Sequence, residues 1–118
     1  MATIDQKKSF INASEIPWET VGEGLRRRIL GYDENLMMTY MDFKKGAVGS
    51  LHSHKHRQVT FVEQGSFEVH IGGVKKTLAR GDCFFVPPDI EHGVVALEDS
   101  RLVDVFTPMR EDFLVRKP

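Results

Sequence analysis

The chain has 118 residues, 41% of them hydrophobic and 28% charged, and its formal net charge at pH 7 is −1. This length predicts one domain, large enough to bury a core without disulfide bonds. The near-neutral charge excludes the basic surface that nucleic-acid binding requires. The N-terminus lacks an apolar signal region and no apolar run has the length of a membrane span, so we expect a cytoplasmic protein with neither a nucleic-acid nor a membrane partner.

The chain divides into a polar lead-in, residues 1–20, and a β-rich body, residues 21–118. Trp18 is expected to anchor the lead-in onto the body. In the body, β-branched and aromatic runs alternate with turns rich in glycine, proline and aspartate, which predicts an all-β sandwich or barrel. Helical periodicity is limited to residues 110–115, where we expect one short terminal turn. The expected strands are residues 25–30, 36–43, 59–62, 67–71, 74–79, 83–86, 93–97 and 102–106.

The basic run and the single cysteine both indicate structural roles. On a strand, Arg26 and Arg28 share one face while Arg27 takes the other, which favours a solvated strand or salt bridges over phosphate binding. Cys83 stands alone, so an intramolecular disulfide is excluded. Its apolar neighbours predict a buried, inert thiol.

A glycine-bounded stretch in the middle of the chain contains His52 and His54, one residue apart, followed by Gln58. Side chains alternate along a strand, so both histidines are expected on one face, which Gln58 shares if strand pairing is continuous. A later stretch places His92 behind a glycine and proline turn. Because imidazole is the commonest metal ligand in proteins, these residues predict a metal site.

The two stretches resemble the paired motifs of the cupin superfamily over residues 46–96. In the first motif, which runs from glycine through His-x-His to an acidic ligand and a second glycine, Gln58 stands at the acidic position. In the second, Asp89 replaces a glycine and Ala96 replaces an asparagine. Aspartate tolerates turn conformations better than most residues, so Asp89 is compatible with the motif. The resemblance implies a single-domain cupin, an all-β jelly roll (double-stranded β-helix) that holds a metal ion.

Gln58 in place of a carboxylate changes the chemistry of such a site. Three imidazoles and an amide are all neutral, so the ligands leave the charge of a divalent cation uncompensated. Such a cation attracts an anionic substrate and polarises oxygen, which favours Lewis-acid chemistry over oxygen chemistry. The donors do not distinguish nickel, manganese, iron, cobalt and zinc.

Two further histidines have other expected roles. His56 has the strand parity of His54, but another ligand would crowd the site. For His56 a place behind a metal ligand or at the pocket rim and a merely exposed position both stay open. His70, in an apolar run, is expected to be structural.

A narrower resemblance covers most of the chain, from about residue 16 to 114. Gln58, residues 17–31, the turn at 87–93 and the tail at 104–114 are similar to KdgF, a family of pectin-degradation cupins. This resemblance implies ring opening of 4,5-unsaturated uronates to linear keto-deoxyuronates, by a homodimer. It also implies a divalent metal on His52, His54, Gln58 and His92, and catalytic roles for Asp104, Phe106 and Arg110.

The implied roles follow the chemistry of these side chains. Arg110 or the metal would hold the carboxylate of the anionic sugar, Asp104 would move a proton, and Phe106 would pack on the sugar face. The residues by themselves leave open a structural pair between Asp104 and Arg110 at the barrel rim. Two other functions also stay open: an iron-dependent cupin dioxygenase acting on a small organic acid, and a non-catalytic sugar-binding cupin.

Overall fold

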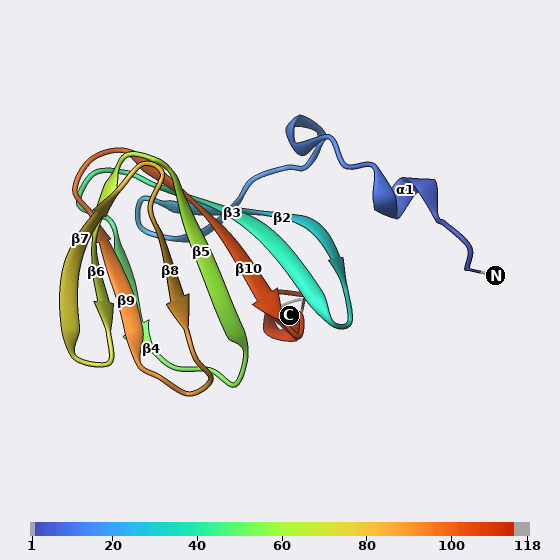
Figure 1. Cartoon of the computed structure of the whole chain (residues 1–118). Helices are drawn as coiled ribbons and strands as arrows, with labels where there is room; N and C mark the ends of the chain where they lie inside the picture. Colours follow the sequence, from blue (N-terminus) through green and yellow to red (C-terminus); the bar gives the residue numbers. More distant parts are fainter. Residues whose placement is uncertain (1, 115–118) are drawn as a thin grey trace.

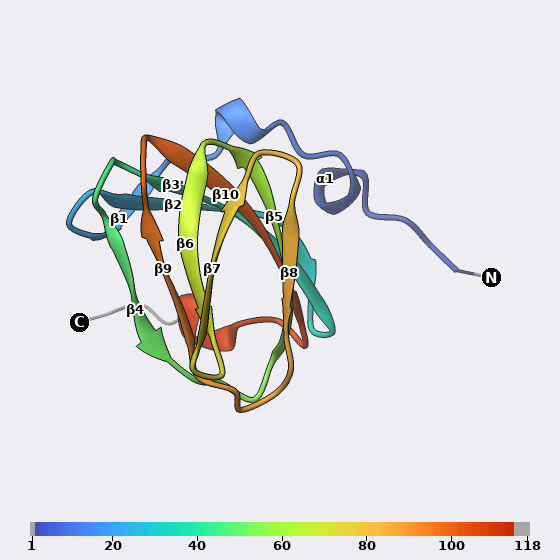
Figure 2. The same ribbon diagram turned by 60° about the vertical axis from the view of Figure 1, so that its left-hand side comes forward.

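The computed structural model describes residues 2–114 as a body of two antiparallel sheets packed face to face, with an N-terminal segment extending away from it (Figures 1 and 2). The larger sheet has the strand order β1-β2-β3-β10-β5-β8, and the smaller has the order β4-β9-β6-β7. This is the predicted jelly roll. The elements are α1 (Gln6–Ser9), the 3-10 turn η1 (Ala13–Glu15), β1 (Glu19–Gly22), β2 (Leu25–Asp33), β3 (Leu36–Phe43), β4 (Val48–His52), β5 (Arg57–Gln64), β6 (Ser66–Ile71), β7 (Val74–Ala79), β8 (Cys83–Val86), β9 (His92–Ala96), β10 (Ser100–Thr107) and the 3-10 turn η2 (Glu111–Phe113).

Strict alternation along the central strands decides what faces the space between the sheets. In β5, Gln58, Thr60 and Val62 are buried whereas Val59 and Phe61 are exposed. Along β5 the inward residues Gln58 and Thr60 are polar, whereas Val62 joins the apolar core. The core thus fills one half of the barrel and leaves the other half for a polar site. The core residues are Phe43, Val62, Phe67, Val69, Phe84, Val86, Val94, Ala96 and Leu102.

Every strand that the sequence predicts is present, and two further strands accompany them. β1 and β4 escaped prediction because β1 has only four residues and β4 contains glycine and serine, both weak strand signals. The expectation that His52 and His54 share a strand face is wrong, since β4 ends at His52. The one-turn helix α1 was also not predicted. The division between lead-in and body at residue 20 stays a prediction.

Trp18 anchors the lead-in onto the body as expected. The guanidinium carbons of Arg26 and Arg28 lie 4.3 and 4.2 Å from the centroid of its ring. Both arginines therefore face the same side of β2, while Arg27 points the other way and pairs with Glu19. The alternation inferred from the sequence is confirmed, and the basic run serves cation–π contacts and ion pairs.

The expectation of a buried cysteine is wrong, because Cys83 is exposed. In β8, Phe84 and Val86 are buried whereas Cys83 and Phe85 point outward, so an apolar run does not by itself identify the inner face.

The turns of the two cupin motifs depend on backbone with positive φ. Gly65 has φ +80°, and a side chain there would also overlap the Ser100 hydroxyl. Asp89, which stands in the place of a motif glycine, has φ +65°. Aspartate therefore adopts the left-handed turn that the motif requires, as its chemistry predicts.

The chain leaves the barrel after β10 and forms a short turn at the end of the described segment (Figure 1). The predicted helical turn over residues 110–115 is confirmed in part as η2, while residue 115 lies outside the described residues. No helix within residues 2–114 combines the length and the apolar character needed to cross a bilayer.

Candidate metal centre

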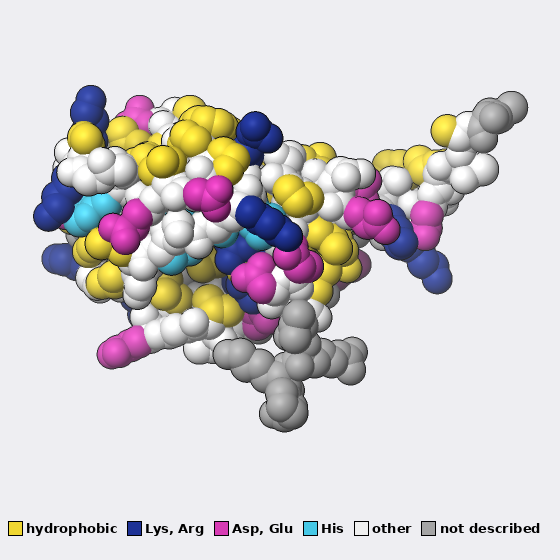
Figure 3. Space-filling view, turned by 90° about the horizontal axis from the view of Figure 1, so that it is seen from below, with side chains coloured by type: hydrophobic (Ala, Val, Ile, Leu, Met, Phe, Trp, Pro, Cys, Tyr) yellow, Lys and Arg dark blue, Asp and Glu magenta, His cyan; other side chains and the backbone are white. Residues whose placement is uncertain are grey.

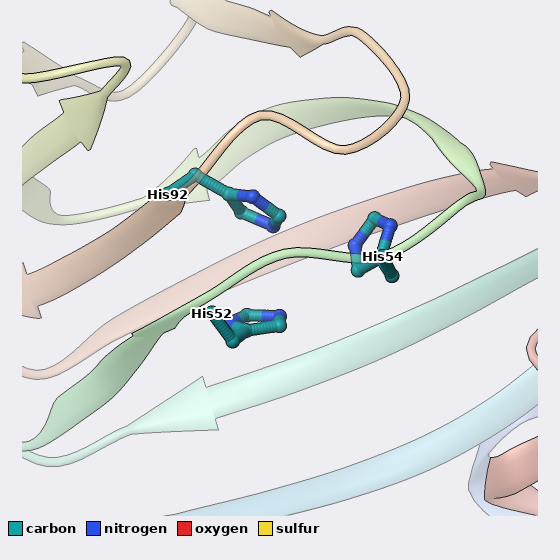
Figure 4. Close-up of side chains that lie close together, drawn as sticks. All are labelled: His52, His54 and His92. Atoms are coloured by element: carbon teal, nitrogen blue, oxygen red, sulfur yellow. The ribbon is translucent and has the colours of Figure 1, made fainter.

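His52, His54 and His92 turn their rings toward one another at one end of the barrel (Figure 4). One nitrogen from each ring can be chosen so that all three lie within 4.8 Å of one another. His52 ends β4 and is paired in register with His92, the first residue of β9. The ring centroids of His52 and His92 are 4.4 Å apart, and those of His54 and His92 are 4.8 Å apart.

His54 reaches this cluster from the loop that follows β4, and the second motif holds that loop in place. The backbone N–H of Asp89 donates to the carbonyl of His54 over 2.8 Å. The left-handed turn at Asp89 thus fixes the backbone of a histidine more than thirty residues earlier in the chain. The two motifs are joined physically at this hydrogen bond.

Each of the three rings has the same hydrogen-bond arrangement. Its Nδ1 lies within hydrogen-bond distance of a backbone carbonyl, which can only accept, so Nδ1 carries the proton and the neutral ring keeps a lone pair on Nε2. Such second contacts orient histidines that bind metals. The pairs are His52 with Ser50 at 2.8 Å, His54 with His56 at 3.0 Å and His92 with Ile90 at 2.9 Å.

The amide oxygen of Gln58 points toward the three histidines. The NH2 group of Gln58 donates to the Thr60 hydroxyl over 2.8 Å and to the Asp104 carboxylate over 3.4 Å, which turns Oε1 toward the histidines. That oxygen lies 3.1 Å from Nε2 of His54. Nε2 of His92 is buried and has no hydrogen-bond partner within the described chain. Lone pairs that converge without a donor between them fit a bound cation.

Burial keeps two of the three histidines, His54 and His92, neutral. The pKa of His92 is lowered to about 4, chiefly by burial and in smaller part by the neighbouring His52, His54 and Arg110. Burial also lowers the pKa of His54, and the Arg110 charge acts in the same direction. Both rings are therefore deprotonated at neutral pH, which is the state that binds a metal ion.

Asp104 lies beneath this cluster on β10, next to Thr60 in the sheet register. Its side chain is 7% exposed and accepts a hydrogen bond of 2.6 Å from the Thr60 hydroxyl. Burial raises the pKa of this carboxyl to about 6, against the opposing effects of the Thr60 hydroxyl and the Arg110 charge. A group with a pKa near neutrality can both take up and release a proton.

Arg110 lies above Phe106, at the mouth of the same end of the barrel. Phe106 is 2% exposed, its ring centroid is 6.0 Å from that of His54, and the Arg110 guanidinium carbon is 5.1 Å from the Phe106 centroid. The carboxylate partner of Arg110 is Asp112, through contacts of 3.0 and 2.8 Å. Within residues 2–114 no ion pair joins Arg110 to Asp104, so the alternative of a structural pair between these two residues is wrong. Viewed from below, histidines lie among basic and acidic side chains (Figure 3).

The chain is similar to known proteins along most of its length. Residues 39–106 match the family described as "Cupin domain". The chain is 44% identical over 110 residues to the "Pectin degradation protein KdgF" of Dickeya dadantii (strain 3937), across 92% of this chain and 99% of the relative. The chain belongs to the KdgF family of cupins.

Two solved structures share its fold closely. KdgF from Halomonas sp. has a TM-score of 0.85 and 42% identity, with 88% of this chain and 96% of that chain covered. An RmlC-like cupin from Shewanella frigidimarina NCIMB 400 has a TM-score of 0.85 and 44% identity, with 86% of this chain and 92% of that chain covered.

This KdgF-family cupin also has contacts at the site that the sequence did not reveal. His56 is 4% exposed and its Nε2 lies 3.1 Å from a carboxylate oxygen of Glu111, so the alternative of an exposed histidine is wrong. The pair of Arg110 with Asp112 was also missed, although the acidic residues directly after Arg110 are a local signal for it. The contact of Arg27 with Phe113 has no local signal, because it joins opposite ends of the chain.

Proposed function

We propose that this KdgF-family cupin is a metal-dependent enzyme that opens the ring of 4,5-unsaturated uronate monosaccharides, giving linear keto-deoxyuronates. The observation that carries the proposal is the neutral donor set beside a buried carboxyl, Asp104, whose pKa is about 6. The relative from Dickeya dadantii is a pectin degradation protein. An unsaturated uronate suits this site because it is a small anion whose reaction needs proton transfer and no oxidant.

The reaction is an isomerisation with a simple balance of atoms. The anomeric hydroxyl loses its proton, the bond between C1 and the ring oxygen breaks, and C1 becomes an aldehyde. The ring oxygen leaves as an enolate, and a proton added at C4 converts that enolate into the C5 ketone. One proton leaves an oxygen and one arrives at a carbon, so a single group that alternates between acid and base serves both steps.

We assign that group to Asp104. Its raised pKa brings proton uptake and release by the carboxyl close to neutral pH, so the carboxylate can accept the hydroxyl proton and return one at C4. The Thr60 hydroxyl, 2.6 Å away, orients the carboxyl. Phe106 forms an apolar wall between Asp104 and the mouth of the site and helps to exclude water.

We assign the substrate carboxylate to Arg110. The contacts of Asp112 use Nε and one terminal nitrogen of the guanidinium, so the other terminal nitrogen is left for the sugar. Asp112 is more than half exposed, with 57% of its side chain in solvent. Its carboxylate contacts the Arg110 guanidinium in the way that the carboxylate of a bound sugar would. A planar carboxylate on a planar guanidinium fixes the orientation of the ring toward Asp104.

We assign the metal to Nε2 of His52, His54 and His92 together with Oε1 of Gln58. A divalent cation held there, nickel, manganese, iron, cobalt or zinc, would supply Lewis-acid stabilisation of the negative charge that develops on the ring oxygen. The protein contributes four neutral donors, three of them oriented by backbone carbonyls. This leaves the charge of the site positive and suited to an anionic sugar.

We further propose a homodimer that forms through the outer face of the larger sheet. Val59, Phe61 and Phe85 are 44%, 44% and 53% exposed on this face. Val59 and Phe85 are register partners on adjacent strands, so the exposed apolar surface is continuous. A second copy with the same face is a self-complementary partner. The cytoplasmic location expected from the sequence stays a prediction.

The test of the function follows the decay of the C4=C5 ultraviolet absorbance of freshly released unsaturated galacturonate. We expect the metal-loaded protein to accelerate this decay without consuming oxygen. We expect Asp104→Asn to lower kcat by about 10²–10⁴-fold, the range typical of a lost acid–base group. Arg110→Ala should raise KM, while Arg80→Ala, which removes an exposed arginine elsewhere, should have no effect.

The outcomes separate the three candidate functions. Decay no faster than the spontaneous reaction would reject ring opening and leave a sugar-binding cupin. Oxygen uptake that accompanies the decay would identify a dioxygenase. An Asp104→Asn variant as fast as wild type would remove the proton-transfer assignment while keeping the enzyme class.

A further inference from the structure

The guanidinium of Arg110 lies in the corner formed by two aromatic rings that are nearly perpendicular to each other. Its central carbon lies 5.1 Å from the ring centroid of Phe106 and 4.3 Å from that of Phe113. The two rings meet edge to face with centroids 5.7 Å apart. Only 11% of the Arg110 side chain is exposed. One of these rings belongs to the barrel and the other belongs to η2, so the position of Arg110 depends on how η2 is held.

Arg27 also holds Phe113 in place. Its guanidinium carbon lies 3.7 Å from the Phe113 centroid, and its Nε donates to Glu19 over 2.8 Å. Both cations therefore contact Phe113, and each faces the electron-rich face of a ring. Arg27 contacts Phe113, and Arg110 contacts both Phe113 and Phe106.

His56 fixes the start of the same turn. Its Nε2 donates to Glu111 over 3.1 Å, since a carboxylate oxygen can only accept, and Glu111 also pairs with Lys55 at 3.3 Å. The carbonyl of His56 accepts the hydrogen bond from Nδ1 of His54 at 3.0 Å. His56 is thus in direct contact with both the histidine cluster and the turn that follows Arg110.

The ligand atoms of His56, Glu111 and Asp112 also lie within 4.8 Å of one another, which is a spacing compatible with a second cation. However, both carboxylates already have cationic partners. Glu111 pairs with Lys55, and Asp112 binds Arg110 through two contacts. A metal ion would have to displace these side chains, so we interpret the cluster as a support for η2.

We propose that His56 and Phe113 are positioning residues for Arg110, which act by holding η2 against the barrel so that the guanidinium stays in the corner formed by the two rings. The proposal rests on the proposed function only for the identity of the anion that Arg110 binds. A preoriented guanidinium binds a carboxylate without first losing its own rotational freedom. Because Arg110 holds the carboxylate before and during the reaction, disorder of Arg110 affects substrate binding more than the chemical step.

The first measurement observes Arg110 directly and needs no substrate. The zinc-loaded protein is diamagnetic and therefore suitable for NMR. In it, the signals of Hε and Hδ of Arg110 should be shifted upfield by the two rings. These signals are assigned by their absence from the spectrum of Arg110→Lys. We expect Phe113→Leu and Glu111→Ala to abolish most of this shift. Phe113→Tyr, which keeps the ring, should restore it. Glu111 is half exposed, so Glu111→Ala tests the His56 contact without a change in the buried structure.

The second measurement is steady-state kinetics on unsaturated galacturonate. Phe113→Leu and His56→Leu should raise KM by roughly tenfold while kcat changes by less than about threefold. Phe113→Tyr should recover the KM of wild type. His70→Leu is the matched control for His56→Leu, because His70 pairs with Glu68 at 2.8 Å on the smaller sheet, away from η2. Zinc content and melting temperature should be recorded for each variant.

The outcomes distinguish a failure of this positioning role from a failure of the proposed ring-opening function. An unchanged upfield shift in both Phe113→Leu and Glu111→Ala overturns the positioning role, whatever the kinetics. A lost shift with wild-type KM in an active enzyme also overturns it. If the shift is lost but wild-type protein does not act on unsaturated uronates, the positioning of Arg110 stands and the proposed function falls.

Discussion

The amide oxygen of Gln58 lies 3.1 Å from Nε2 of His54, and both atoms are acceptors. The proton of the His54 ring is on Nδ1, which bonds to a backbone carbonyl. The amide protons of Gln58 point to Thr60 and Asp104. Two lone pairs therefore face each other without a proton between them, an arrangement that is unfavourable unless a cation lies beside them.

Replacing the Gln58 oxygen should weaken metal binding. We expect Gln58→Leu, which keeps the volume of the side chain and removes its donors, to lower the affinity for zinc by about 10–100-fold, measured by competition with a chelator. Gln58→Glu should bind at least as tightly as wild type, because a carboxylate adds a charge to the ligands. The matched control is Gln64→Leu, an exposed glutamine at the end of the same strand. Equal affinity of Gln58→Leu and wild type would exclude Gln58 as a ligand.

The buried, unpartnered Nε2 of His92 leads to a second expectation. His92→Ala should lower the metal content of purified protein well below one ion per chain, because removal of one ligand leaves an incomplete site. His70→Ala should keep full occupancy, since the His70 ring pairs with Glu68 on β6, a different strand of the smaller sheet from those that carry His52 and His92. Elemental analysis of both variants decides the matter. Equal metal content in the two would show that the ion binds elsewhere.

The sequence predicts the sheet and the identity of the converging side chains better than it predicts how they converge. The alternation in β5 correctly places Gln58 and Thr60 inside the barrel, because a half-buried strand has a strict period of two. The same rule fails for His54, which lies beyond the end of β4. Its position depends on a backbone hydrogen bond from Asp89, a contact between distant segments that no local pattern encodes.

The support of Arg110 could not be predicted for a similar reason. The contacts of Phe113 with Arg27 and of Glu111 with His56 form only after the barrel brings distant segments together. A phenylalanine in a short tail otherwise suggests simple packing. Cys83 shows the opposite error, since apolar neighbours along the chain do not report which face of a strand is buried.

Burial of Asp104 should make the stability of the metal-free protein depend on pH. Its pKa is raised from an ordinary 3.8 to about 6, so the folded state binds the proton more tightly than the unfolded state. The free energy of unfolding should therefore fall as pH rises from about 4 to about 6, and this loss should persist at higher pH. The loss is at most about 3 kcal/mol, at about 1.36 kcal/mol for each pKa unit.

The Asp104→Asn variant isolates this contribution, because the titration of all other groups is common to both proteins. In urea unfolding with excess chelator, the variant should be more stable than wild type at pH 8 by up to the same amount, about 3 kcal/mol, and nearly equal to it at pH 4. The variant keeps an oxygen for the Thr60 hydroxyl, so that hydrogen bond is conserved. Stability differences that do not vary with pH would contradict the raised pKa.

The exposed apolar face of the larger sheet leads to a prediction about assembly. Phe85→Lys places a charge in the centre of the proposed interface, where an unpaired charge cannot be buried without a large cost. We expect light scattering coupled to size exclusion to give a dimer for wild type and a monomer for the variant at the same micromolar concentration. Val74→Lys, at a 60% exposed position on β7 of the other sheet, should remain dimeric. A monomeric wild type, or a Phe85→Lys variant that remains dimeric, would exclude this face as the interface.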